Sequence, residues 1–330
     1  MALRDQIIRK AQDLGADLVG IADAARFAAA DGNIVQCLFP AARSVIGLGF
    51  RILRGSLRGV EEGTNYFQLE KTGPKFIEET VMPGIARRLA VFLEDCGFEA
   101  SVQLAYPRIR PDDSIVPTVN HHELYLGKSA ENALNFTDAA VLCGLGELGM
   151  SGHLLTDSFG PWQRCCFILT DAVLEPDPIQ PRHLCDGCGE CRKQCPGHYT
   201  FAPDTAVRKI GSQAYTVYSF NPWHCYIYYH GANRTKNPFL PPAAFPNIPD
   251  RLKVMSGSID LDDQAVQQVV ASLDELFDSC QGGMGMQRTL SICGFACDRA
   301  CYIHLEEQDA LSVKYVEQFR KQPDWFLSVD

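Results

Sequence analysis

Residues 185–196 read Cys185-Asp-Gly-Cys188-Gly-Glu-Cys191-Arg-Lys-Gln-Cys195-Pro196, which has the spacing C-x2-C-x2-C-x3-C-P. Three thiolates spaced in this way, on a loop loosened by two glycines, can hold three corners of one 4Fe–4S cubane, while the fourth cysteine faces a second cluster. Structural zinc is the main alternative, but zinc sites generally use two C-x2-C pairs with a longer spacer between them. The stretch therefore predicts iron–sulfur ligands.

A second cluster needs further thiolates, and the later sequence contains them. In residues 293–301 a cysteine recurs at every fourth position, and Cys225 lies between the two groups. The alternative is a single cluster, with the later cysteines buried as small apolar side chains. We expect two clusters, one held by Cys185, Cys188, Cys191 and Cys301, the other by Cys195, Cys225, Cys293 and Cys297.

Five other cysteines fall in or near apolar segments. We expect them to pack in the core: Cys37, Cys96, Cys143, Cys165 and Cys166.

The composition places the chain among globular proteins. It has 330 residues, of which 46% are hydrophobic and 21% charged, enough for about two domains. A formal net charge of −10 disfavours a large nucleic-acid partner. No apolar signal core opens the chain and no stretch is long enough to span a membrane, so we expect no membrane contact. Fourteen cysteines then predict a metal-binding protein of the reducing cytoplasm.

Helical and extended patterns alternate up to residue 175. Apolar periodicity predicts helices at 2–14, 74–96 and 129–143, with Pro83 kinking or dividing the second one. Short apolar runs predict strands at 17–22, 44–50, 98–104 and 163–171. Such alternation is typical of a layered α/β (α+β) domain.

After residue 175 the pattern changes. Prolines lead into the cysteine-rich stretch, and five more make residues 237–250 irregular. Amphipathic helices are expected at 261–279 and 309–321. The predicted domains are a core over 1–175, a two-cluster module with an inserted proline-rich segment over 176–308, and a C-terminal helix within 309–330.

Residues 143–164 contain Gly-Leu-Gly-Glu-Leu-Gly-Met-Ser-Gly-His and continue into Phe-Gly-Pro-Trp-Gln-Arg. This segment resembles the glycine-rich loop and following strand of the cobalamin-dependent iron–sulfur reductases, the reductive dehalogenases and epoxyqueuosine reductases. The cysteine run of residues 185–196 follows this segment at the distance expected for the family. Residues 14–22 are also similar to the N-terminal helix–strand unit of the family. The resemblance is strongest over 140–200 and thin over 50–130 and 200–290.

The resemblance implies a nitroreductase-like core that carries a base-off cobalamin, and a two-cluster ferredoxin-like module that delivers electrons to it. The sequence also lacks the D-x-H-x-x-G element of proteins that ligate cobalt through histidine. Without the resemblance, the glycines could simply make tight turns before a strand. The implied cobalamin contacts are Gly144, Gly146, Gly149, Met150, Ser151 and Gly152.

The sequence departs from the family in three places. The proton-donating aspartate of epoxyqueuosine reductases would fall near Ala130, beside Glu131. The second cysteine group has the spacing C-x3-C instead of C-x2-C, and only 29 residues follow Cys301, which leaves no helical-repeat tail for tRNA. We therefore expect reductive cleavage of a carbon–halogen or carbon–oxygen bond in a small organic substrate, with reduced ferredoxin or flavodoxin as electron donor. The alternatives are a ferredoxin-like electron carrier that serves a partner enzyme and an epoxyqueuosine reductase acting on tRNA.

Reductive cleavage also needs a proton donor that is still protonated at neutral pH. A polar stretch over 106–131 concentrates suitable groups, although it could equally be a solvated loop. The candidate donors are Tyr106, His122, Tyr125 and Glu131, with Arg108 or Arg110 holding an anionic group.

Overall fold

The computed structural model describes residues 2–29, 32–104, 134–279 and 292–329. The chain divides into two compact units. The first comprises residues 1–52, 74–186 and 207–216, and the second comprises 53–73, 187–206 and 217–330. These bounds differ from the predicted domains in three ways: residues 53–73 belong with the second unit, residues 176–186 and 207–216 belong with the first, and residues 309–330 are part of the second.

A four-stranded sheet forms the centre of the first unit. Its order is β1 (Leu18–Asp23), β4 (Ser44–Arg51), β8 (Gln163–Thr170) and β5 (Ala100–Gln103), and every neighbouring pair is antiparallel. Residues Ser44 to Phe50 of β4 are all buried, which explains why the sequence there is an unbroken apolar run. The predicted mixture of helix and sheet is confirmed, and the four predicted strands are present within one or two residues of their expected bounds.

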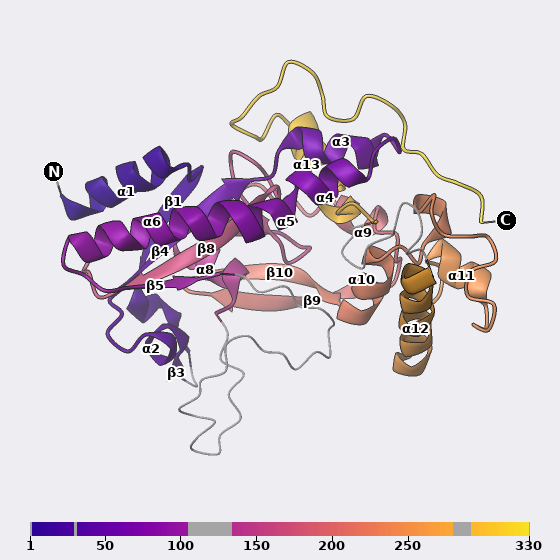
Figure 1. The fold of residues 1–330 in the computed structure, drawn as a ribbon, viewed down its shortest axis with the longest axis horizontal. Coiled ribbons are helices and arrows are strands. Elements are labelled where there is room, and N and C mark those ends of the chain that lie inside the picture. Colours follow the sequence, from indigo (N-terminus) through magenta and orange to yellow (C-terminus); the bar gives the residue numbers. More distant parts are fainter. Residues whose placement is uncertain (1, 30–31, 105–133, 280–291, 330) are drawn as a thin grey trace. The chain divides into compact units, whose positions relative to one another are not determined.

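Helices and short strands surround this sheet. Helices α1 (Leu3–Leu14) and α6 (Met82–Asp95) lie side by side and contact its strands (Figure 1). Helix α8 (Phe136–Leu142) packs against β8. The remaining elements of this unit are η1 (Ala24–Phe27), β2 (Ala28–Ala29), β3 (Gly32–Asn33), α2 (Ile34–Leu38), α5 (Pro74–Phe76), η2 (Ile77–Val81), β6 (Glu147–Leu148) and β7 (Leu154–Leu155).

The predicted helix over 74–96 is divided, as its proline suggests. A π-helical turn over Ile77–Val81 precedes α6, and Pro83 lies in the first turn of α6. Proline has no N–H to donate to the preceding turn, so the regular hydrogen-bond ladder is interrupted there.

The second unit is mainly helical. Helices α10 (Pro222–Tyr229) and α12 (Asp263–Ser279) pack together through a buried cluster that includes Ile227, Tyr228 and Val269. Helix α9 (Glu190–Lys193) packs against α13 (Ala296–Glu307). The other helices are α3 (Arg54–Glu61), α4 (Phe67–Thr72), η3 (Arg234–Lys236) and α11 (Arg251–Ser256). As predicted, residues 237–250 form neither helix nor strand.

A β-hairpin that the sequence analysis missed lies between Cys195 and Cys225 in the chain. Strands β9 (Phe201–Ile210) and β10 (Gln213–Phe220) pair with each other, and Gly211 in the turn has φ +56°. Because a two-residue hairpin turn that contains glycine between alternating segments is a standard hairpin signal, the pattern was present in the sequence.

The predicted C-terminal helix is wrong. Residues 309–329 form no helix in the described chain. Side chains bind the backbone there instead: Arg54 donates to the Glu317 carbonyl at 2.7 Å, and the Phe319 N–H donates to the Glu306 carboxylate at 2.7 Å. These bonds occupy backbone groups that a helix would have paired with each other.

Two of the five cysteines expected in the core are exposed. Cys37 lies in α2 and Cys96 follows α6, and both face solvent, so the expectation was wrong for them. Cys143 and Cys166 are buried, and Cys165 is half-buried.

No helix in the described part of the chain combines the length and the apolar character that crossing a bilayer requires.

Candidate iron–sulfur and cofactor site

The loop that carries the first cysteines turns on two glycines. Gly187 and Gly189 have φ of +82° and +76°, a region that residues with a Cβ rarely adopt. Gly189 also caps the short helix α9, which carries Cys191, and Cys195 follows that helix. Cys191 and Cys195 are both buried. The glycines therefore let the chain reverse between closely spaced thiols.

Four of the predicted ligands lie close together in the second unit. Burial raises the pKa of the Cys225 thiol, and the neighbouring Cys293 and Cys195 raise it further. Burial, together with the neighbouring Cys195, raises the pKa of Cys293 to about 11. Burial raises that of Cys297 well above its ordinary value, with contributions from Asp298 and from the other three thiols. The structure thus brings together Cys195, Cys225, Cys293 and Cys297, the set predicted for one cluster.

The chemistry of this donor set suits a metal. Burial likewise raises the pKa of Cys195, so all four thiols favour the protonated form when no cation is present. Iron reverses this preference, since a thiol that coordinates the metal releases its proton to solvent and binds as the thiolate. Cys195 is buried and the other three are half-buried. Four neighbouring thiols from three separate stretches of chain form a donor set that fits a metal cluster.

Helices α9 and α13 bring the other cysteines of the second unit near one another. Cys191 is on α9, Cys301 is on α13, and these helices are in contact. The Cys188 sulfur lies within 4.8 Å of a ring nitrogen of His304. His304 was not predicted as a site residue, although it follows Cys301 by three residues and so lies on the same side of a helix.

Cys185 belongs to the first unit, where the glycine-rich segment holds it. The Met150 N–H donates to the Cys185 sulfur at 3.3 Å. The Glu147 carboxylate is only 1% exposed and accepts three successive N–H groups: those of His183 at 2.5 Å, Leu184 at 3.0 Å and Cys185 at 2.8 Å. Glu147 was not predicted as a site residue, although a carboxylate inside an otherwise apolar glycine-rich segment is a recognisable signal.

Most glycines of the predicted cobalamin loop are explained by close packing. A Cβ on Gly144 would lie 2.5 Å from a carbonyl oxygen, and one on Gly146 would lie 2.1 Å from another. A Cβ on Gly149 would lie 3.0 Å from a leucine side chain. Gly152 differs, because no atom lies within 4 Å of its added Cβ, although its φ of +79° is as unfavourable for other residues as the +75° of Gly144. The open side of this segment is therefore the turn formed by Met150, Ser151 and Gly152.

The predicted proton donors lie outside the described residues. This applies to Tyr106, His122, Tyr125 and Glu131, and also to Arg108 and Arg110.

A groove of about 700 Å³ lies in the second unit, beside the cysteine-rich stretch. Its lining combines aromatic side chains, including Tyr199 and Phe220, with Arg192 and Asp260. None of the described residues predicted for the site lines it.

Comparisons with known proteins give partial matches. No model of a protein family matches the chain. Over 60 residues, 17% of this chain, the sequence is 42% identical to the tetrachloroethene reductive dehalogenases of Desulfitobacterium hafniense and Dehalobacter restrictus, and the match spans 11% of their length. The predicted resemblance to reductive dehalogenases is thereby confirmed.

Similar solved structures include both kinds of reductase. An epoxyqueuosine reductase from Streptococcus thermophilus matches with 16% identity and a TM-score of 0.39, over 60% of this chain and 53% of that one. A catabolic reductive dehalogenase matches with 17% identity and a TM-score of 0.49, over 86% of this chain and 37% of that one. This chain therefore covers about half or less of each of these relatives.

Proposed function

We propose that this chain is an oxidoreductase in which two 4Fe–4S clusters deliver electrons to a bound base-off cobalamin, for reductive cleavage of a carbon–halogen or carbon–oxygen bond in a small organic substrate. In this proposal a nitroreductase-like core binds cobalamin and substrate, and a ferredoxin-like module holds the clusters. The observation that carries it is that Cys195, Cys225, Cys293 and Cys297, from three stretches of the chain, lie near one another.

The ligands of the other cluster are proposed as the sequence predicts them. Cys185, Cys188, Cys191 and Cys301 supply four thiolates, and the N–H of Met150 already donates to the first of these sulfurs. Hydrogen bonds from backbone amides to ligand sulfurs are one of the means by which a protein tunes a cluster. The same backbone segment would contact the cobalamin, so electrons would have a short path between the two cofactors.

The residues available to cobalamin are those of the turn Met150–Gly152. Gly152 leaves open space, and Ser151 offers a hydroxyl to the polar side chains of a corrin. When bound, cobalamin supplies the cobalt centre at which the bond is cleaved. The protein's part is to bind and orient both partners and to supply a proton, for which Tyr106, His122, Tyr125 and Glu131 remain the proposed sources.

The proposed setting is the cytoplasm, with reduced ferredoxin or flavodoxin as electron donor. A tRNA substrate is less favoured, because the net charge of −10 would repel a phosphate backbone. An electron carrier without cobalamin is the stronger alternative, since close packing alone accounts for Gly144 and Gly146.

Anaerobic purification and reconstitution test this function, with iron, sulfide and cobalt quantified after incubation with cobalamin. We expect about eight irons, in two cubanes, and about one cobalt per chain. Clusters without cobalamin binding would instead identify an electron carrier. Two or fewer irons, or stoichiometric zinc, would rule out both readings.

A further inference from the structure

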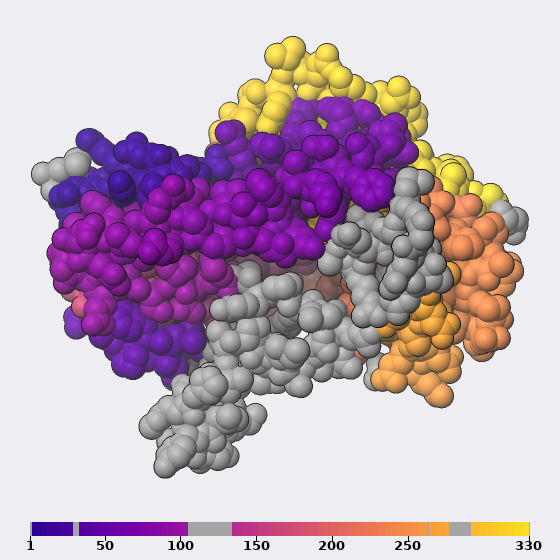
Figure 2. Space-filling model, viewed as in Figure 1, coloured from indigo at the N-terminus to yellow at the C-terminus, as the bar shows by residue number. Residues whose placement is uncertain are grey.

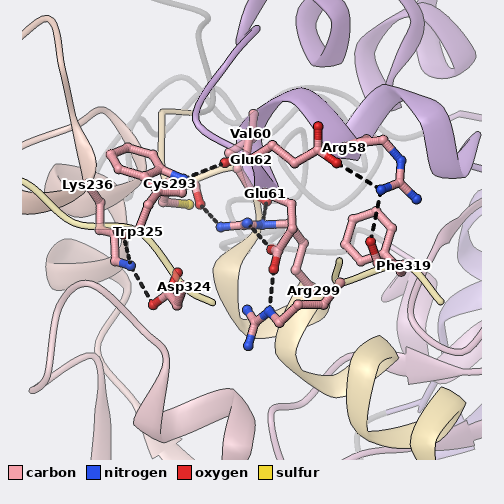
Figure 3. A network of polar contacts seen from close by, with 12 residues as sticks. Arg58, Val60, Glu61, Glu62, Lys236, Cys293, Arg299, Phe319, Asp324 and Trp325 are labelled. Carbon is pink, nitrogen blue, oxygen red and sulfur yellow. Dashed lines mark hydrogen bonds and ion pairs between the residues drawn. The ribbon is translucent and has the colours of Figure 1, made fainter. Parts of the chain in front are cut away.

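A buried carboxylate links three distant parts of the second unit (Figure 3). Glu61, the last residue of α3, has a side chain that is 3% exposed. One of its carboxylate oxygens pairs with Arg299 of α13, and the other pairs with Arg320 of the C-terminal segment. A carboxylate at such a depth is stable only when it is paired, so these contacts are a built feature of the fold.

Arg299 extends this network to the loop between two predicted cluster ligands. Its Nε donates to the Gly294 carbonyl at 2.8 Å, and a terminal nitrogen donates to the Cys293 carbonyl at 3.4 Å. Gly294 has φ +56°, and a Cβ there would lie 2.1 Å from the Val60 side chain. The guanidinium therefore fixes the backbone between Cys293 and α13, while the loop packs against α3.

The C-terminal segment holds the network from the outside. Figure 2 shows this segment, in yellow, lying over the part of the chain that contains α3. The indole N–H of Trp325 donates to the Val60 carbonyl at 3.1 Å, and Lys236 pairs with Asp324 at 2.6 Å. Together with the bond from the Phe319 N–H to Glu306, these contacts hold the segment on both sides of Arg320.

The charged groups also lie near the thiols in space. Glu61, Arg299 and Arg320 line a small cavity of about 20 Å³ together with Cys293. Gln194 and Pro196, the neighbours of Cys195, line the same cavity. Unit charges at this range in a buried setting interact far more strongly than they would in water.

We propose that Glu61 and Arg299 are positioning residues for the cluster held by Cys195, Cys225, Cys293 and Cys297, and that their opposite charges set its reduction potential. This inference rests on the proposed function. A cluster gains negative charge when it is reduced, so the Arg299 guanidinium favours the reduced form and the Glu61 carboxylate opposes it. Local charge and hydrogen bonding are established determinants of cluster potential.

The test is an EPR-monitored redox titration of the reconstituted full-length protein. Glu61→Gln should shift the potential of one cluster to more positive values, and Arg299→Gln should shift it to more negative values. Glu62→Gln is the matched control, because Glu62 neighbours Glu61 but pairs with Arg58 at 2.9 Å near the surface. This control should leave both potentials unchanged.

Shifts of the reduction potential in opposite directions would show charge tuning. A purely structural role would instead lower the iron content of both variants, and the potential of any cluster that remains would shift in the same direction in both or stay unchanged. The latter result would overturn the proposal. If both variants fail to fold, the titration is done on Arg320→Gln, which removes the more exposed partner of Glu61. This variant should shift the reduction potential of the cluster to more negative values. An unchanged potential in Arg320→Gln would then contradict the inference. Absence of clusters in the unmodified protein would contradict the proposed function instead.

Discussion

A single buried carboxylate, that of Glu147, organises the backbone immediately before the first predicted cluster ligand. It accepts the N–H groups of His183, Leu184 and Cys185, of which Leu184 is buried and needs a partner within the protein. Hydrogen bonds to a charged acceptor are among the stronger ones, and each contributes more than a neutral pair. One side chain thus fixes both the direction of the loop and the position of Cys185.

We expect Glu147→Gln to lower the free energy of unfolding by about 2–3 kcal/mol, because an amide replaces one acceptor oxygen with a donor that opposes the backbone N–H. Urea unfolding under reducing conditions measures this loss. Asp157→Asn is the control, since exposed Asp157 pairs with His183 at 2.7 Å and should change stability by less than about 1 kcal/mol. Equal effects of the two substitutions would contradict the role given to Glu147.

The thiols of the central sheet differ from those at the surface. Burial raises the pKa of Cys165 to about 12, so at pH 8 its thiolate fraction is about a thousandfold below that of an ordinary cysteine. We expect iodoacetamide at pH 8 to alkylate the exposed Cys37 and Cys96 at least about a hundredfold faster than Cys165. Peptide mass spectrometry over a time course measures the rates, and early modification of Cys165 would show that the sheet is open there.

At the scale of elements, the C-terminal segment shows that a chain without helix or strand can still be well anchored. Phe319 is fully buried and meets the ring of Tyr302 edge-on at 5.9 Å. The guanidinium groups of Arg54 and Arg58 lie 5.6 and 5.4 Å from its ring centre. The segment is therefore held by one aromatic anchor and by polar contacts to its backbone.

Phe319→Ala should reduce the free energy of unfolding by about 3–5 kcal/mol, since it leaves a cavity under two arginines. It should also speed tryptic cleavage at Arg320 and Lys321. Val316→Ala is the matched control, because Val316 is fully exposed only three residues away and should alter neither quantity. Limited proteolysis with a parallel thermal melt measures both, and resistance of the Phe319 variant to trypsin would argue against the anchor.

For the whole molecule, sequence reasoning succeeded where local rules decide the outcome. The periodicity of 2–14 and 261–279 predicted helices that are present, and Pro83 marked the division of a longer one. Cysteine spacing grouped Cys195 with thiols about 100 residues later, and the structure places these thiols near one another; their role as cluster ligands stays a prediction. Under the proposed function, ligand spacing carries this information because a cluster would impose its own geometry on the chain.

The parts that were missed depend on contacts between remote residues. Glu61 and Arg299 are 238 positions apart, and no local pattern reveals that they pair. The apolar periodicity of the C-terminal segment predicted a helix, yet the side chain of Arg54, 263 positions earlier in the chain, donates a hydrogen bond to the Glu317 carbonyl. Tertiary contacts override local propensity in the C-terminal segment.

The central claim is that two separate sets of four cysteines each hold a cubane. Iron quantification with EPR, on the reconstituted protein and on Cys225→Ser, tests it most directly. We predict about eight irons in the unmodified chain and about four in the variant, with one of two reduced-cluster signals retained. An unchanged iron content in Cys225→Ser, or zinc in place of iron, would contradict the account.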